Sequence, residues 1–298
     1  MGPSGANPEV VNPSNPPVGS SRLVPFANRW SRWPWWALVT VLLGIVFVWV
    51  IATDSTYQAA FNFILIGLST TIVITLIAYP LALLLGLIIA LGRISRNIFA
   101  YQISTFYVEI VRGLPTLVLI LYVAYGLTPV ISNLINGIGS RMIEWNVLLQ
   151  LATGMSTLRV RDISSETRGV FALVVAYAAF LSEIFRAGIE SIDRGQIEAA
   201  RALGMTYWQA MYHVVLRQAI RQVLPPLGND FIAMLKESSL LSAIGVAEIT
   251  QKGGFYATTY FLPNQSYGVL AFLYLTMTLL LSMVVKWIER RMARERRA

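Results

Sequence analysis

The sequence is organised around a polar stretch, Glu198-Ala199-Ala200-Arg201-Ala202-Leu203-Gly204, which continues through charged and amide side chains to Leu224-Pro225-Pro226. Hydrophobic segments lie on both sides of it, but its arginines and glutamines are too numerous for a helix inside a bilayer. Gly204 permits a bend and Thr206 is a suitable N-cap, so the pattern predicts two short helices that meet at the glycine. We expect the proline pair to end the second helix and to start the next element. The stretch therefore predicts a helical hairpin held against a membrane.

The overall composition is that of a polytopic α-helical membrane protein. Of the 298 residues, 56% are hydrophobic and 13% are charged, and the mean hydropathy is +0.61, which is too apolar for a soluble domain. The net charge is +8, but before the extreme C-terminus no run of basic residues stands apart from the hydrophobic segments. We therefore attribute the charge to loops that orient the helices and expect no nucleic acid partner. The absence of cysteine excludes disulfides, thiolate metal sites and a cysteine nucleophile.

Hydrophobic runs of bilayer length predict an all-α fold with six transmembrane helices. They lie at about residues 35–52, 61–91, 101–127, 169–185, 226–249 and 268–287. The fifth of them is interrupted by the polar residues Lys236-Glu237-Ser238-Ser239. The second run exceeds the roughly 20 residues that a bilayer requires, so we expect a tilt or an extension beyond the lipid, with a kink at Pro80. Residues 1–33 are rich in Pro, Gly, Ser and Asn and are predicted to be a disordered tail, and residues 291–298 form a basic tail.

The distribution of arginine predicts the orientation of these helices. Arginines precede the first span, follow the second and recur through residues 187–224. With six spans these regions share one side, and the positive-inside rule assigns that side and both termini to the cytoplasm. The opposite side then receives a long polar segment at about residues 128–168, in which a helix is expected around Met142–Leu151. It also receives a shorter outer loop at Lys252-Gly253-Gly254.

The polar stretch resembles the EAA loop of ABC-importer permeases. Glu198-Ala199-Ala200 and Gly204 match the spacing of that loop, and the match continues through Leu224-Pro225 to Lys236-Glu237-Ser238-Ser239-Leu240. A lone Glu-Ala-Ala occurs in many helices, whereas these segments occur in the expected order and in a membrane context.

An upstream segment, Val108-Glu109-Ile110-Val111-Arg112-Gly113-Leu114-Pro115, resembles the Arg-Gly-x-Pro segment of the polar amino acid subfamily. The resemblance covers about residues 60–290 and implies the type I ABC importer (MetI-like) permease fold. That fold needs only five spans, so the helix at 34–55 is an addition. The permease domain would then occupy residues 56–290, with an EAA-like coupling loop at 187–225.

The resemblance implies a membrane subunit that works with several partners. These are a dimer of ABC ATPase subunits, a second permease subunit of the same or a homologous chain, an external substrate-binding protein and a polar amino acid. The location implied is the bacterial plasma (inner) membrane. Glu198 would pair with a basic residue in a groove of the ATPase, and Gly204 would permit close approach. The alternative for this loop is an amphipathic helix lying on the membrane surface.

We expect no catalytic residue, metal site or cofactor on this chain. No Gly-x-x-x-x-Gly-Lys-[Ser/Thr] phosphate loop is present, so ATP and Mg are expected on the partner ATPase. His213 is the single histidine and no cysteine accompanies it, so it is interpreted as a structural or contact residue.

Charged residues within hydrophobic segments are candidates for a substrate pathway, because charge at membrane depth costs at least about 2.5 kcal/mol. Arg112 could bind a substrate carboxylate through its planar guanidinium, or form an internal ion pair with Glu109 on the same helix face. Gly113 and Pro115 would open the helix locally and free backbone groups to line a cavity; alternatively, they serve helix packing.

The later spans add further polar candidates, namely Glu183, Lys236, Glu237, Ser238 and Ser239. Either glutamate could hold a substrate ammonium group; the structural alternatives are pairing of Glu183 with Arg186 and of Glu237 with Lys236. The two serines could hydrogen-bond their own backbone or a passing polar ligand.

Two other function classes remain open at this point. A self-sufficient secondary transporter or channel would use the buried charges as an ion or proton relay, but the spans show no repeated half. A membrane-anchored scaffold would need no polar groups at membrane depth.

Overall fold

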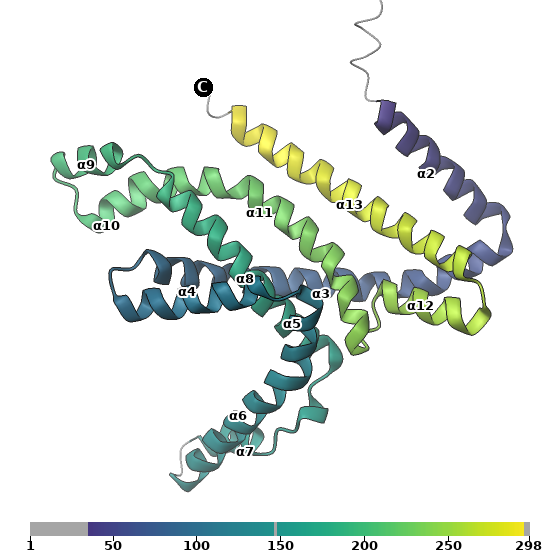
Figure 1. The fold of residues 1–298 in the computed structure, drawn as a ribbon, viewed down its shortest axis with the longest axis horizontal. Helices are drawn as coiled ribbons and strands as arrows, with labels where there is room; N and C mark the ends of the chain where they lie inside the picture. Colours follow the sequence, from purple (N-terminus) through teal and green to yellow (C-terminus); the bar gives the residue numbers. More distant parts are fainter. Residues whose placement is uncertain (1–34, 146–147, 295–298) are drawn as a thin grey trace, which may run out of the picture. The chain divides into compact units, whose positions relative to one another are not determined.

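The computed structural model describes residues 35–145 and 148–294, and within these ranges helices joined by short connections account for the fold (Figure 1). The first helix, α2, spans Trp35–Thr53. The chain divides after Trp49 into two units, and the packing and sites described below are those of the second unit, from Val50 onward.

The second unit contains four long helices and several shorter ones. The long helices are α3 (Ser55–Ile94), α8 (Ser165–Glu190), α11 (Arg217–Glu237) and α13 (Pro263–Arg294). The shorter elements are α4 (Ile98–Gly113), α5 (Thr116–Tyr122), η1 (Val123–Leu127), α6 (Thr128–Glu144), α7 (Leu149–Ser156), η2 (Val160–Asp162), α9 (Arg194–Ala202), α10 (Tyr207–Ala210), η3 (Met211–Leu216), η4 (Ser238–Ile244) and α12 (Ile249–Tyr260).

Several helices begin where a side chain accepts hydrogen bonds from the first free backbone N–H groups. The capping residues are Asp54 for α3, Asn97 for α4, Ser164 for α8, Asp193 for α9 and Glu248 for α12. Such caps satisfy donors that have no partner inside the helix, so these helix starts are encoded locally.

The core is formed where α3 crosses α8, and small residues allow the two helices to approach closely. Ala78 and Ala82 of α3 and Ala176 and Ala179 of α8 are fully buried. A Cβ added to Gly86 of α3 would lie 3.0 Å from the Ala178 carbonyl oxygen of α8. In a membrane, close backbone approach of this kind supplies the van der Waals contact that hydrophobicity alone does not.

A second close contact joins α3 to the start of α12, and it yields a testable prediction. A Cβ on Gly67 would lie 2.7 Å from the backbone carbonyl carbon of Glu248, and backbone cannot yield as a flexible side chain can. We expect Gly67→Ala to lower the free energy of unfolding by about 1–3 kcal/mol. Thermal unfolding of the purified protein in detergent measures this. The control is Gly44→Ala in α2, where the new methyl group meets nothing within 4 Å; an equal loss there would contradict the packing explanation.

Four helical stretches are long and apolar enough to cross a bilayer: 55–94, 116–144, 165–190 and 263–291. A shorter apolar helix covers 37–53. Helices therefore occur where the first, second, fourth and sixth spans were predicted. The second is 40 residues long, so it exceeds the length of a bilayer as expected, and it extends beyond the predicted bounds 61–91 at both ends. Pro80 lies inside it.

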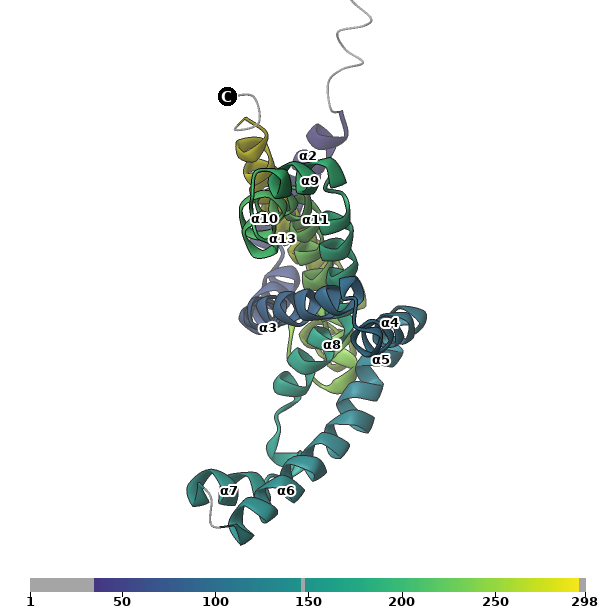
Figure 2. The same ribbon diagram turned by 90° about the vertical axis from the view of Figure 1, so that its left-hand side faces the viewer.

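The predicted bounds of the third span, 101–127, were wrong, because the helix breaks inside this range and the apolar stretch of bilayer length is 116–144. The helix stops at Gly113, Leu114 is extended at ψ 143°, and α5 begins after Pro115. The polar segment at 128–168 is not an open loop either, because α6 continues the apolar stretch to Glu144. The helix expected around Met142–Leu151 is absent as such, since the chain leaves α6 at Trp145 and re-enters a helix at Leu149. Both views show α6 and α7 extending away from α3 and α8 (Figures 1 and 2).

The predicted ends of the fifth span also need correction. Pro225 and Pro226 lie inside α11 and do not end a helix. A proline removes one backbone donor, but Val223 and Leu227 on either side are buried against the core, and this packing holds the helix together. The predicted interruption at Lys236-Glu237-Ser238-Ser239 is confirmed, because α11 ends at Glu237 and the chain continues as the 3₁₀ turn η4. The outer loop expected at Lys252 is instead part of α12.

Candidate functional site

The EAA-like segment, residues 187–225, forms a helical hairpin between α8 and α11. The helix α9 ends in a pair of hydrogen bonds in which Gly204 N–H donates to the Arg201 carbonyl at 2.9 Å and Met205 N–H donates to the Ala200 carbonyl at 3.1 Å. This pairing requires a left-handed residue, and Gly204 has φ +80°. The predicted bend at Gly204 is confirmed.

The second helix of the hairpin begins with a reciprocal cap. The Thr206 hydroxyl accepts from Gln209 N–H at 3.4 Å, while the Gln209 side-chain oxygen accepts from Thr206 N–H at 2.8 Å. This is the capping-box arrangement, which satisfies two backbone donors at once. The predicted N-cap at Thr206 is confirmed, and both turns of the hairpin follow from local sequence.

The EAA-like residues of the hairpin differ in their exposure to solvent. Ala200 is buried, as are Ala210 and Val215 on the helices against which α9 packs. Glu198 and Ala199 are exposed. Leu203, at the tip, is 84% exposed. Ala200 therefore holds the hairpin together, while Glu198, Ala199 and Leu203 are available to a partner.

A cluster of charged side chains lies where α8 approaches the hairpin. One carboxylate oxygen of Glu183 accepts from Arg93 of α3 at 2.6 Å and from Arg112 of α4 at 2.9 Å. The other accepts from Nη2 of Arg186 at 2.8 Å, and Arg186 also pairs with Glu190 at 2.8 Å. One carboxylate thus binds three guanidinium groups from three helices. We call these five residues the Glu183 cluster.

The cluster changes the interpretation of the third predicted span. The internal pair of Arg112 with Glu109 is not formed, because the helix break at Leu114 and the packing of α4 on α8 direct Arg112 to Glu183, 71 residues away in sequence. Glu109 is exposed. Gly113 and Pro115 bracket the break, as expected of a locally opened helix. Arg186 does pair with Glu183, and Arg93 was not among the sequence candidates.

The remaining pathway candidates lie at the end of α11. Lys236 is exposed and Glu237 is half-buried, and they form no ion pair among the described side chains. The Tyr177 hydroxyl of α8 lies near the Glu237 carboxylate. Ser238 is buried and donates to the Leu235 carbonyl at 2.7 Å, which is the backbone bonding expected of it. The Ser239 carbonyl accepts from the Ser242 hydroxyl at 2.7 Å.

Sequence reasoning missed one fully buried acid, Glu248. Its carboxylate accepts from the N–H groups of Thr250 and Gln251, each at 2.8 Å, and from the Tyr274 hydroxyl at 3.1 Å. These bonds replace water and make burial of the carboxylate tolerable. The available signal was its place directly before a helix, but glutamate is an uncommon N-cap.

Comparison with known proteins identifies a matching family and several similar permeases. The family described as the binding-protein-dependent transport system inner membrane component matches residues 82–294. The probable amino-acid permease protein YxeN of Bacillus subtilis (strain 168) is 33% identical over 236 residues, covering 79% of this chain and 94% of the relative. The glutamine transport system permease protein GlnP of Escherichia coli (strain K12) is 28% identical over 226 residues, covering 76% and 91%.

Solved structures of two ABC transporters contain chains with a similar fold. A chain of an amino acid ABC transporter crystallised with histidines has a TM-score of 0.63 and 33% identity, covering 81% of this chain and 98% of that one. A chain of the MetNI methionine ABC transporter in an inward-facing conformation has a TM-score of 0.60 at 21% identity, covering 78% and 96%, and this likeness concerns the fold.

Apolar helices of bilayer length joined by an exposed polar hairpin define a multi-pass helical membrane protein. The chain belongs to the family of binding-protein-dependent transport system inner membrane components, and its fold is that of a MetI-like ABC importer permease. It is therefore a transport subunit of the inner membrane, a class that does not itself catalyse a reaction. Family membership favours this interpretation over the secondary transporter and the scaffold.

Proposed function

We propose that this chain is the permease subunit of an ATP-driven importer for polar amino acids, which an external binding protein delivers. Two permease subunits and two ATPase subunits form the working complex. The EAA-like hairpin and both termini lie in the cytoplasm. ATP and Mg bind to the ATPase, and substrate crosses by alternating access. The names of the relatives, an amino-acid permease and a glutamine permease, support the substrate class.

The observation that carries the coupling proposal is the exposed hairpin built directly into two long helices. Gly204 and the capping box fix the angle between its two helices, and its first helix follows α8 while its second runs into α11. A partner that moves the hairpin therefore moves both long helices as packed bodies. Glu198 and Leu203 present a charge and an apolar tip to such a partner.

Affinity purification from the native membrane tests the proposal, with mass spectrometry of the proteins that accompany the tagged full chain. We expect an ATPase with a phosphate loop, and either a second permease chain or none, which distinguishes a heterodimer from a homodimer. Uptake by the purified chain alone, driven by an ion gradient and without an ATPase, would refute the proposal.

The same purification tests the role of Glu198. Glu198→Arg reverses a charge that makes no ion pair among the described side chains, and we expect it to reduce recovery of the ATPase at least about tenfold, as reversal of a close charge pair does. The matched control is Glu166→Arg, because Glu166 is also exposed and lies at the start of α8, at the end of that helix far from the hairpin. Equal recovery with both variants would exclude Glu198 from the contact.

A further inference from the structure

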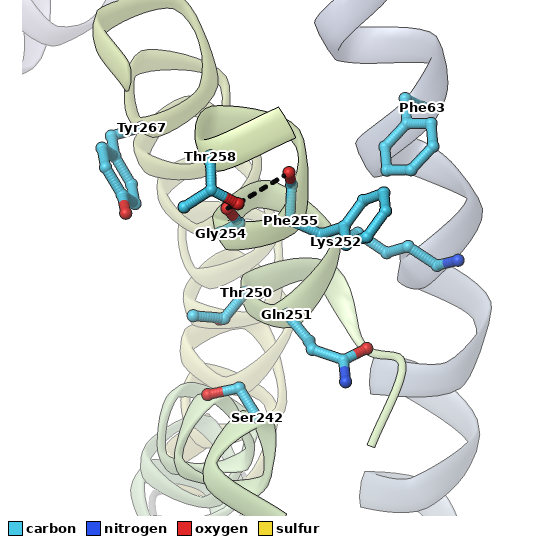
Figure 3. Close-up of a pocket in the computed structure, with 9 residues that line it drawn as sticks. All are labelled: Phe63, Ser242, Thr250, Gln251, Lys252, Gly254, Phe255, Thr258 and Tyr267. Atoms are coloured by element: carbon cyan, nitrogen blue, oxygen red, sulfur yellow. Dashed lines mark hydrogen bonds between the residues drawn. The ribbon is translucent and has the colours of Figure 1, made fainter. Parts of the chain in front are cut away.

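A cavity of about 620 Å³ opens over α12, within the range of about 300–1,000 Å³ typical of small-molecule sites. Its polar lining includes Thr250, Gln251 and Lys252, and its aromatic lining includes Phe63, Phe255 and Tyr267. Figure 3 shows the lysine side chain extending from α12 beside Phe63 of α3. A polar side and an aromatic side thus meet in one pocket.

The pocket contains a positive charge that no described side chain neutralises. The Lys252 ammonium lies 5.5 Å from the centroid of the Phe63 ring and forms no ion pair. Glu248, one turn earlier, cannot serve, because its carboxylate is turned inward and is bonded by backbone N–H groups and by Tyr274. The Phe63 ring also stacks on Phe255 at 6.0 Å, so the aromatic surface beside the ammonium is built from two helices.

The pocket and the EAA-like hairpin lie at opposite ends of α3. Phe63 is 30 residues before Arg93, the α3 member of the Glu183 cluster, which corresponds to about 45 Å along a helix. Figure 1 likewise shows α12 and the α9–α10 hairpin at opposite ends of the second unit. If the hairpin is cytoplasmic, the pocket is on the side where substrate arrives.

We propose that the α12 pocket binds the α-carboxylate of the incoming amino acid. The Lys252 ammonium pairs with the carboxylate, the Gln251 side-chain amide offers a further donor, and the Phe63–Phe255 surface contacts the rest of the ligand. This site rests on the proposed function and adds to it a place where substrate is held before it crosses. An anionic lipid headgroup offers related chemistry, and the experiment separates the two sources.

The experiment measures equilibrium binding to the full chain in phosphatidylcholine nanodiscs. The probes are l-glutamine, l-glutamate, l-arginine and l-histidine, each compared with its α-amide, which lacks the carboxylate charge. We expect the wild type to prefer at least one free amino acid over its amide. We expect Lys252→Met to weaken binding of that amino acid by about tenfold without changing binding of the amide, and Lys252→Arg to retain binding within about threefold.

Lys286→Met is the matched control, since Lys286 is an exposed lysine of α13 outside the pocket; it should leave binding unchanged. A loss shared by the acid and the amide in Lys252→Met would indicate a general structural effect and would overturn the proposal. So would binding that is unchanged in Lys252→Met, or that does not distinguish acid from amide in the wild type.

Repeating the measurement with phosphatidylglycerol in the nanodiscs tests the lipid source. Carboxylate-dependent binding of the amino acid should persist in these nanodiscs. If phosphatidylglycerol abolishes that binding, the pocket is a site for the lipid headgroup and the proposal is overturned. Whole-cell uptake of the same amino acids separates the two hypotheses. Uptake without a contribution from Lys252 would refute the pocket alone, whereas no amino acid uptake would refute the proposed function.

Discussion

Gly204→Val is expected to abolish most transport while the protein still inserts into the membrane. Gly204 adopts φ +80°, a conformation that costs a non-glycine residue about 1–2 kcal/mol and a β-branched one more. No atom lies within 4 Å of a Cβ placed there, so the cost comes from the backbone alone. To escape it, the turn between α9 and α10 must change its angle, and the hairpin then no longer presents Glu198 and Leu203 together. We expect uptake to fall at least about tenfold, as a conformational penalty of 1.4 kcal/mol implies.

A graded series makes this prediction specific. Gly204→Asn should retain more uptake than Gly204→Val, because asparagine tolerates the left-handed conformation better. Gly137→Val is the matched control, since Gly137 is an exposed helical glycine of α6 with open space around it, and valine is no worse than glycine in a helix. Uptake assays measure transport, and immunoblots of membrane fractions measure how much of each variant is inserted. Equal uptake by Gly204→Val and wild type would refute a role for the hairpin angle.

Glu183→Gln is expected to give the largest loss of stability. The side chain is 21% exposed and accepts hydrogen bonds from Arg93, Arg112 and Arg186, and the side chain of Arg93 is only 10% exposed. Removing the charge leaves Arg93 and Arg112 without their counterion where α3, α4 and α8 meet, and leaves Arg186 with Glu190 alone. Breaking a buried ion pair from one side costs about 3 kcal/mol or more. We therefore expect a clear fall in the thermal midpoint of the detergent-solubilised protein.

Glu190→Gln is the control for this prediction. Glu190 bonds to Arg186 as Glu183 does, but its side chain is 51% exposed and it serves a single arginine. Exposed pairs of this kind contribute about 0.5 kcal/mol, so the thermal midpoint should barely change. Glu183→Asp keeps the charge on a shorter side chain and should recover part of the loss. Equal destabilisation by Glu183→Gln and Glu190→Gln would show that the cluster is not a structural centre.

Much of the site could be read from local sequence. Asp193, Gly204 and Thr206 act on backbone groups only two to four residues away, so their effect does not depend on the rest of the fold. The long hydrophobic run of α3 likewise predicted a helix longer than a bilayer requires, because burial in a bilayer depends on the composition of the run itself. Membership of the permease family followed from the order of such segments.

The partners of the charges could not be read in this way. Arg112 had a candidate partner three residues away and yet bonds to Glu183, because the break at Leu114 and the packing of α4 on α8 decide which carboxylate it meets. Pro225 was expected to end a helix, but packing on the core maintains α11 through it. Propensity and capping act over a few residues, and the sequence by itself determined those features. Pairing of charges and tolerance of prolines depend on segments distant in sequence, so only the tertiary structure decided them.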